Sequence, residues 1–235
     1  MLITRRDARQ TALLYLLMGL PGVPALAYLP RNFVVSGDAA ATAQRIASGE
    51  TVYRLIILGA LVSMVFFIFL GSKLYQLFEE VDRAQARLLV SFVLISVALG
   101  VVDVICLLTP LVIQSGASSL AAFSPTQLDA MALGALSVRN ALLGVDQTFW
   151  GLWLLPFGIL VIKSGAIPKI LGVFLIMGCV GWVAMSAIFI VAPHAHRLTN
   201  IAFMLAQPGE LSMLGWLLLK SFIPQPAEGR LAYAQ

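Results

Sequence analysis

Long apolar runs, separated by short polar segments, dominate the sequence. These runs are about twenty residues or longer, the length that an α-helix needs to cross a bilayer core of roughly 30 Å. A membrane β-barrel is excluded, because it needs alternating segments of about ten residues. The predicted fold is an all-α, polytopic membrane helix bundle of about six transmembrane helices, with short extra helices on the outer side. The predicted spans are about 11–29, 52–78, 88–113, 125–162, 168–191 and 199–222.

Two segments between the apolar runs begin as helices do. Asp38 is a favoured N-cap residue and precedes a run of strong helix formers, which predicts a short surface helix. Ser124 is followed by Pro125 and, three residues after the cap, by Gln127. This is the capping-box pattern with proline at the first helical position. The fourth span is therefore predicted to begin near Pro125.

Two of the predicted spans are not expected to be simple straight helices. The first has an arginine-rich start and an A-x-A tripeptide at 25–27, as a cleaved signal peptide has. We favour a retained helix that is kinked at Pro21 and Pro24. A helix from Pro125 through the fourth span would be roughly 57 Å long at 1.5 Å per residue. It must project outward or bend, for which Gly134 and Gly144 are the candidate positions.

Composition supports the membrane class and orients the chain. Hydrophobic residues make up 60% of the sequence and charged residues only 11%, whereas soluble domains contain about 25% charged residues. The net charge of +4 does not indicate nucleic-acid binding, because the basic residues lie at the span ends. By the positive-inside rule, both termini are predicted to be cytoplasmic. We expect a multi-pass protein of the bacterial plasma (inner) membrane, with the lipid bilayer as its partner and an undetermined oligomeric state.

The whole chain, 1–235, is predicted to form a single transmembrane domain. Residues 1–10 form a cytoplasmic N-terminal segment in this prediction, and residues 223–235 form a flexible cytoplasmic tail.

Polar residues inside the predicted spans are the best indication of function. An ionisable residue at a helix centre costs roughly 2.5–3.5 kcal/mol, so it usually faces a partner or a wet cavity. Arg139 and Asp146 are two turns apart and share a helix face, and Asn140 and Gln147 repeat this step on the adjacent stripe. Residue counts place most of the group in the outer half of the membrane. The candidate ligand-binding residues are Arg54, Asp103, Arg139, Asn140, Asp146, Gln147, Trp150, Gln207 and Glu210.

This polar group has two explanations. In the first, Arg139 pairs with Asp103 or Asp146 and the group only fixes helix packing. In the second, which we favour, it lines a cavity that is open to the outer side, with Trp150 as part of the wall. Three acidic residues face at most two arginines, so one acid is expected to lack a partner, and Glu210 is the candidate.

The sequence offers little for catalysis or metal binding. It contains no nucleophile–base, metalloprotease, phosphate-loop or dinucleotide motif. His194 and His196 lie together in a predicted outer turn without a third ligand near them, and Cys106 and Cys179 each lie in an apolar run as small hydrophobes. We therefore predict no catalytic residue, no metal site and no cofactor.

Three functions remain open. The first is binding or transport of a small molecule or ion through an outward-facing intramembrane cavity. The second is a non-catalytic membrane subunit or sensor whose polar cluster only fixes packing. The third, an intramembrane enzyme that acts on a lipid-like substrate, is the least favoured.

Several motifs resemble those of a known family. They are FWGLWLLPFG at 149–158, KSGAIPKILGV at 163–173, ALLYL at 12–16, and GEL at 209–211 followed by WLL at 216–218. With these motifs the chain resembles, almost from end to end, the bacterial membrane family known as domain of unknown function 4386. The resemblance implies an integral membrane protein and a shared fold. It implies no activity, cofactor or site residue.

Overall fold

The computed structural model describes residues 3–223, and this part of the chain is built from helices and turns, with no β-strand. The predicted tail at 223–235 lies outside the described residues, apart from Ile223. Six helical segments are long and apolar enough to cross a membrane: Arg5–Asn32, Glu50–Phe78, Arg83–Gln114, Pro125–Ser164, Lys169–Val191 and His196–Phe222. The prediction of an all-α, multi-pass membrane helix bundle is therefore confirmed.

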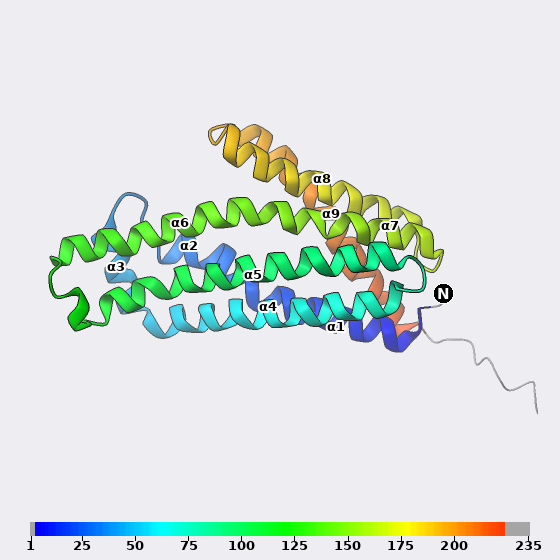
Figure 1. Ribbon diagram of the computed structural model, residues 1–235, viewed down its shortest axis with the longest axis horizontal. Helices are drawn as coiled ribbons and strands as arrows, with labels where there is room; N and C mark the ends of the chain where they lie inside the picture. Colours follow the sequence, from blue (N-terminus) through cyan, green and yellow to red (C-terminus); the bar gives the residue numbers. More distant parts are fainter. Residues whose placement is uncertain (1–2, 224–235) are drawn as a thin grey trace, which may run out of the picture.

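The first and fourth of these segments are subdivided. The elements in order are α1 (Arg5–Val23), a π-helical turn (Pro24–Tyr28), α2 (Leu29–Asn32), α3 (Ala39–Ser48), α4 (Glu50–Phe78), α5 (Arg83–Gln114), a 3-10 turn (Ser118–Leu120), α6 (Pro125–Leu152), α7 (Leu154–Ser164), α8 (Lys169–Val191) and α9 (His196–Phe222). Helices α1, α4, α5 and α6 run along the long axis of the molecule (Figure 1). Helices α8 and α9 form a hairpin that packs on α6, α7 and α1, and its tip diverges from the bundle. Helix α6 extends past that tip toward α3 (Figure 1).

The helix starts follow from local hydrogen bonding. Asp38 caps α3, because its Oδ1 accepts a hydrogen bond from the Ala41 N–H at 2.9 Å. Ser124 and Gln127 form the predicted capping box at the start of α6, with Pro125 at the first helical position. Each pairing satisfies amide groups that have no partner within the helix. Both predicted helix starts are confirmed.

The long fourth span breaks at Trp153, and not at Gly134 or Gly144 as predicted. The break separates α6 from α7 and lies three residues before Pro156. Proline has no N–H and its ring clashes with the carbonyl four residues earlier, which here belongs to Leu152. Glycine alone does not force a bend, so α6 continues through both glycines.

Close contacts between helices depend on glycine at the α8–α9 interface. A Cβ atom at Gly181 would lie 2.5 Å from the Ala206 nitrogen and 2.7 Å from the Ala202 oxygen of α9. A Cβ atom at Gly209 would lie 2.7 Å from the Phe174 oxygen of α8. Small residues allow membrane helices to approach at this distance. The hairpin therefore needs both glycines to close.

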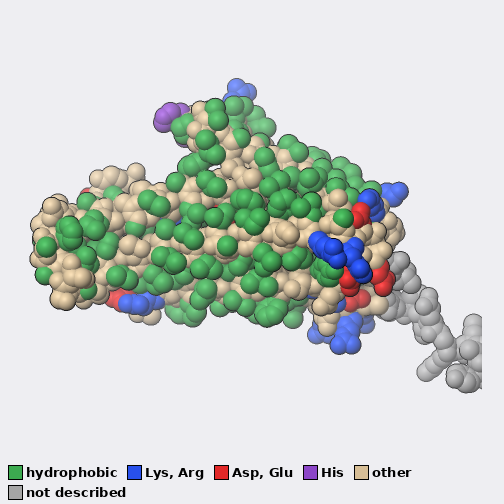
Figure 2. Space-filling view, in the orientation of Figure 1, with side chains coloured by type: hydrophobic (Ala, Val, Ile, Leu, Met, Phe, Trp, Pro, Cys, Tyr) green, Lys and Arg blue, Asp and Glu red, His purple; other side chains and the backbone are tan. Residues whose placement is uncertain are grey.

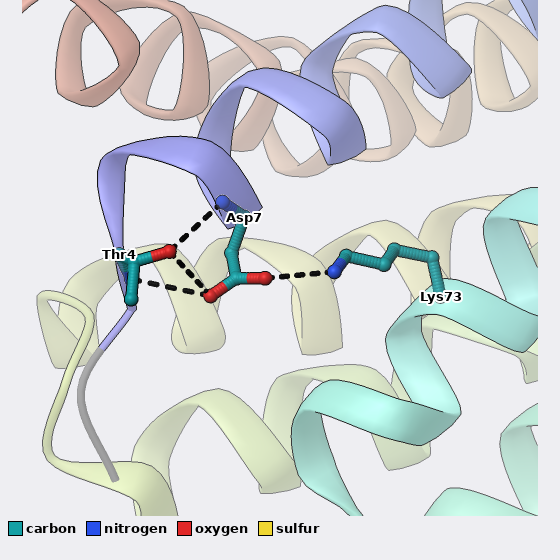
Figure 3. A network of polar contacts seen from close by, with 3 residues as sticks. All are labelled: Thr4, Asp7 and Lys73. Atoms are coloured by element: carbon teal, nitrogen blue, oxygen red, sulfur yellow. Dashed lines mark hydrogen bonds and ion pairs between the residues drawn. The ribbon is translucent and has the colours of Figure 1, made fainter.

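Charged side chains gather at the end of the bundle that holds the start of α1, the α4–α5 turn and the α7–α8 turn; we call it the charged end (Figure 2). The Lys73 Nζ donates a hydrogen bond to Asp7 Oδ1 at 2.7 Å, and Asp7 also forms a capping box with Thr4 (Figure 3). The Lys163 Nζ lies 2.6 Å from Asp82 Oδ2. That hydrogen bond lowers the pKa of Asp82 below its ordinary value. These pairs tie α1 to α4 and the start of α5 to α7.

Candidate functional site

The site begins with a free carbonyl group in the first span. In the π-helical turn, the Leu29 N–H bonds to the Pro24 oxygen five residues earlier. The Ala25 oxygen would next accept from residue 30, but Pro30 has no N–H. The Ala25 carbonyl is therefore left without a helical partner, although Ala25 is only 3% exposed. A buried carbonyl of this kind needs a donor from elsewhere.

Arg139 of α6 supplies that donor. Its Nη2 donates a hydrogen bond to the Ala25 oxygen at 3.0 Å. Its Nε lies 2.9 Å from Asp103 Oδ1 on α5, and the side chains of Arg139 and Asp103 are 2% and 10% exposed. Of the two predicted pairings, the structure forms the one with Asp103. A single guanidinium group thus connects the π-helical turn, α5 and α6.

One aromatic residue of α4, Tyr53, lies near this ion pair. The Tyr53 hydroxyl of α4 donates a hydrogen bond to the Leu107 oxygen of α5 at 3.0 Å. The Tyr53 ring packs edge to face on Phe33, with ring centres 5.2 Å apart. Tyr53 is fully buried, at 0% exposed. The pair is thereby held in a fixed frame of α4 and α5.

A pocket of about 300 Å³ reaches Arg139 from the α3 end of the bundle. Its walls come from α2, from the segment between α2 and α3, and from α6. The lining residues are Leu29, Pro30, Val34, Ser36, Gly37, Leu133, Leu136, Ser137, Arg139 and Asn140. Arg139 is the charged residue among them, so the pocket has a cationic group at its buried end. We call this the Arg139 pocket.

Asp146 lies deeper along α6 and outside the pocket lining. The Trp150 Nε1 donates a hydrogen bond to Asp146 Oδ2 at 2.9 Å, and Ser96 of α5 lies beside the same carboxyl group. Asp146 is 4% exposed. Its neighbour Gln147 is half-buried on α6. Two of the predicted residues, Asp146 and Trp150, therefore form a separate polar contact below the pocket.

Glu210 lies apart from Arg139, on α9. Tyr15 of α1 and Trp182 of α8 lie near its carboxyl group. Trp182 packs edge to face on Trp150, with ring centres 5.2 Å apart. The pair of indole rings thus joins the surroundings of Asp146 to those of Glu210. Within the described part of the chain, neither Glu210 nor Asp146 forms an ion pair, whereas the sequence led us to expect one unpaired acid.

The structure does not bring all the predicted residues into one cavity. Arg54 is exposed, pairs with Glu50 at 2.7 Å, and lines a second cavity of about 620 Å³ between α3, α4, α5 and α6. Gln207 is half-buried on α9 and lines neither cavity. Of the nine predicted residues, Arg139 and Asn140 line the Arg139 pocket and Asp103 contacts Arg139. The structure therefore separates the predicted residues, because the exposed Arg54 side chain pairs with Glu50 and Glu210 lies on α9.

Sequence reasoning missed several members of the site. The sequence did not indicate the Ala25 carbonyl, because in a regular α-helix it would bond to the Leu29 N–H, and Pro30 leaves it free only in the π-helical turn. Ser137 lies three residues before Asn140, on the same face of the helix, and could have been predicted from the position of Asn140. Nothing in the sequence indicated Ser36 and Gly37 as site residues, since their position depends on how the loop folds back on α6. Within residues 3–223, no three His, Cys, Asp or Glu side chains are grouped as metal ligands.

Comparison with known proteins places the chain in a family. The model of the family described as "Domain of unknown function (DUF4386)" matches residues 11–221. No curated protein and no solved structure matches the chain. The matched range begins in α1 and ends in α9, so it covers four spans fully, most of the first and last, and every residue of the candidate site. The chain therefore belongs to the DUF4386 family of domains of unknown function.

Proposed function

We propose that this protein lies in the bacterial plasma membrane and binds a small polar molecule or ion from the outer side, in the Arg139 pocket. One observation carries the proposal: a pocket of about 300 Å³ reaches a buried arginine that α5 and the π-helical turn hold in place. Preorganised polar groups at the end of a concave, partly apolar pocket are typical of small-molecule sites.

The orientation in this proposal follows from the distribution of basic residues. The charged end and the inner helix ends carry nine of them: Arg5, Arg6, Arg9, Lys73, Arg83, Arg87, Lys163, Lys169 and Lys220. The α3 end and the tip of the α8–α9 hairpin carry Arg31, Arg45, Arg54 and Arg197. Lysine and arginine are enriched on the cytoplasmic side of membrane proteins. The charged end then faces the cytoplasm, and the Arg139 pocket opens outward.

Binding is the step that the geometry supports, and transport would extend it. The pocket ends at Arg139, whereas Asp146 and Glu210 lie further toward the charged end. The two carboxyl groups are linked through the paired rings of Trp150 and Trp182. Intramembrane acids in series are typical of ion and proton pathways. A transporter would need a second state in which the pocket opens toward these acids.

A purely structural role is the second candidate. The observation that favours it is that Arg139 forms an ion pair with Asp103 and donates a hydrogen bond to the Ala25 carbonyl at the same time. Such a group fixes three helices without any ligand. In that case the Arg139 pocket has no occupant, and the protein serves as a subunit or sensor.

Thiol labelling from the outer side tests whether the pocket is open. We suggest Ser137→Cys and Asn140→Cys in a background in which alanine replaces Cys106 and Cys179. Val145→Cys is the matched control, because Val145 is an exposed apolar residue of the same helix. A charged, membrane-impermeant reagent should label positions 137 and 140 and spare position 145. The proposal fails if neither pocket position reacts, or if position 145 reacts equally fast.

A further inference from the structure

The guanidinium group of Arg139 uses only part of its donor set within the protein. Arginine has five N–H donors in a planar fork. The Nε and Nη2 atoms face Asp103 and the Ala25 oxygen. The Nη1 atom makes no hydrogen bond with a described residue and, unlike Nε, is not among the fully buried atoms that lack a partner; the Arg139 residue itself lines the pocket. A buried arginine, 2% exposed, thus keeps donors for a group that enters the pocket.

The walls of the Arg139 pocket divide into an apolar and a polar half. Five of the ten lining residues are apolar: Leu29, Pro30, Val34, Leu133 and Leu136. The hydroxyl groups of Ser36 and Ser137 and the amide of Asn140 accompany Arg139 in the other half. Such a lining suits a molecule with a short apolar body and one polar end.

The charges around the pocket favour an anion as that polar end. Asp103 is not a lining residue and faces the Nε and Nη2 atoms, so a ligand beside Nη1 does not meet its carboxylate directly. Near the entrance, Arg31 follows Pro30 in the chain, and Arg45 lies 3.4 Å from the Asn32 oxygen. Asp38, next to the lining residue Gly37, keeps its negative charge while its Oδ1 accepts a hydrogen bond from the Ala41 N–H at the start of α3, and it is not a lining residue. Charge-assisted hydrogen bonds from arginine to an oxyanion are about twice as strong as neutral ones.

We propose that the Arg139 pocket binds a small oxyanion, a carboxylate or phosphate, that carries a short apolar body. The oxyanion accepts hydrogen bonds from Arg139 Nη1, and the apolar body lies against Leu133 and Leu136. This inference rests on the proposed function and adds the class of ligand. The same chemistry is present in a free solute and in the headgroup of an anionic lipid.

Three four-carbon probes of similar size test the class: butyrate, butyramide and butylammonium. Binding of each is measured by equilibrium dialysis on the full-length protein in phospholipid-free maltoside micelles. We expect butyrate to bind about tenfold more tightly than butyramide, which is a difference of about 1.4 kcal/mol, and the ammonium to bind least. Short-chain phosphatidylglycerol is then added as a competitor. Displacement of butyrate by a lower concentration of this lipid than of unlabelled butyrate identifies a lipid headgroup as the source, and the reverse identifies a free solute.

Two substitutions locate the binding. Ser137→Leu fills the pocket from an exposed position and should weaken butyrate binding by about tenfold or more. Arg139→Lys keeps a cation for Asp103, removes the Nη1 donors, and should have a similar effect. Val138→Leu is the matched control, because Val138 is 62% exposed and does not line the pocket. It should leave the affinity unchanged.

The ligand class is overturned if butyramide or the ammonium binds as tightly as butyrate, or if Ser137→Leu has no effect. It is also overturned if thiols at 137 and 140 are labelled while none of the probes binds. In that last case, the proposal of an open pocket stands and only its ligand class is wrong. A pocket that is closed to labelling overturns both.

Discussion

Replacing Asp103 with asparagine leaves the guanidinium group of Arg139 without its counter-charge in a nearly fully buried position. Asparagine has a similar size, so packing is kept and the charge alone changes. The hydrogen bond from Arg139 to the Ala25 oxygen is unaffected by the substitution. The variant therefore isolates the contribution of the ion pair to stability.

The magnitude follows from the distance. Opposite charges 2.9 Å apart attract by about 6 kcal/mol at an effective dielectric constant of about 20. The asparagine oxygen still accepts a hydrogen bond, which recovers part of this energy. Removing one member of a buried pair usually costs about 3–5 kcal/mol, because the other charge stays desolvated. We expect Asp103→Asn to lower the free energy of unfolding by about 3 kcal/mol.

Reversible unfolding in mixed detergent and dodecyl sulfate micelles measures this change. Glu50→Gln is the matched control, because it removes the exposed Arg54–Glu50 pair, and helical pairs of this spacing are worth about 0.3–0.5 kcal/mol. The double variant Asp103→Asn/Arg139→Gln completes a cycle. It removes both charges, so its loss of unfolding free energy should be clearly smaller than the sum of the losses in the two single variants.

Two results would refute this reasoning. One is an Asp103→Asn variant within about 0.5 kcal/mol of the native protein, near the error of such cycles. The other is a double variant whose cost equals the sum of the single costs. Either would mean that Arg139 is solvated in the membrane and is not held by Asp103.

Three further predictions concern other parts of the molecule. Gly181→Ala should destabilise the fold by about 1–3 kcal/mol, because its Cβ would lie 2.5 Å from the α9 backbone. Gly134→Ala, the control, has open space around the new Cβ and should be neutral or stabilising. Melting temperatures of the two variants test this. Tyr53→Phe should cost about 1 kcal/mol in unfolding titrations, since it removes a buried hydrogen bond to α5. The lowered pKa of Asp82 means that its pairing with Lys163 stabilises the fold above the ordinary aspartate pKa of about 4 and is lost as the pH falls through the lower, folded-state value. Asp82→Asn should therefore flatten the decline of the melting temperature between pH 5 and pH 3, and an unchanged decline would contradict this.

Most of the fold was predictable from the sequence, because bilayer-spanning helices can be recognised from their length and their apolar composition. The predicted span 52–78 corresponds to α4, Glu50–Phe78, and the predicted span 168–191 to α8, Lys169–Val191. The capping residues Asp38 and Ser124 also gave the starts of α3 and α6.

The break between α6 and α7 was misplaced for a physical reason. The prediction weighed glycine, which tolerates a bend, above proline, which imposes one. Pro156 lies near the middle of a long apolar run and reads there as part of the span. Its effect on the preceding turn, at Trp153, is what separates the two helices.

The candidate site was predictable only in part. Helical periodicity placed Arg139 and Asp146 on one face, and the scarcity of arginines in the spans reduced the pairings to two. The choice between Asp103 and Asp146 depends on how α5 packs on α6, which periodicity does not determine. Arg54 was misassigned because the prediction used only its depth in the membrane, and depth does not determine which side of the bundle a side chain faces.

Protection of one thiol tests the central claim most directly. In Ser137→Cys, in the background that lacks the native cysteines, the labelling rate by a charged reagent is measured from the outer side with and without butyrate. Gln44→Cys, in the second cavity, is the control. We predict that butyrate slows labelling at position 137 in a saturable way and leaves position 44 unchanged. A thiol at position 137 that does not react, or that reacts at the same rate with and without butyrate, contradicts a binding pocket at Arg139 for this class of ligand.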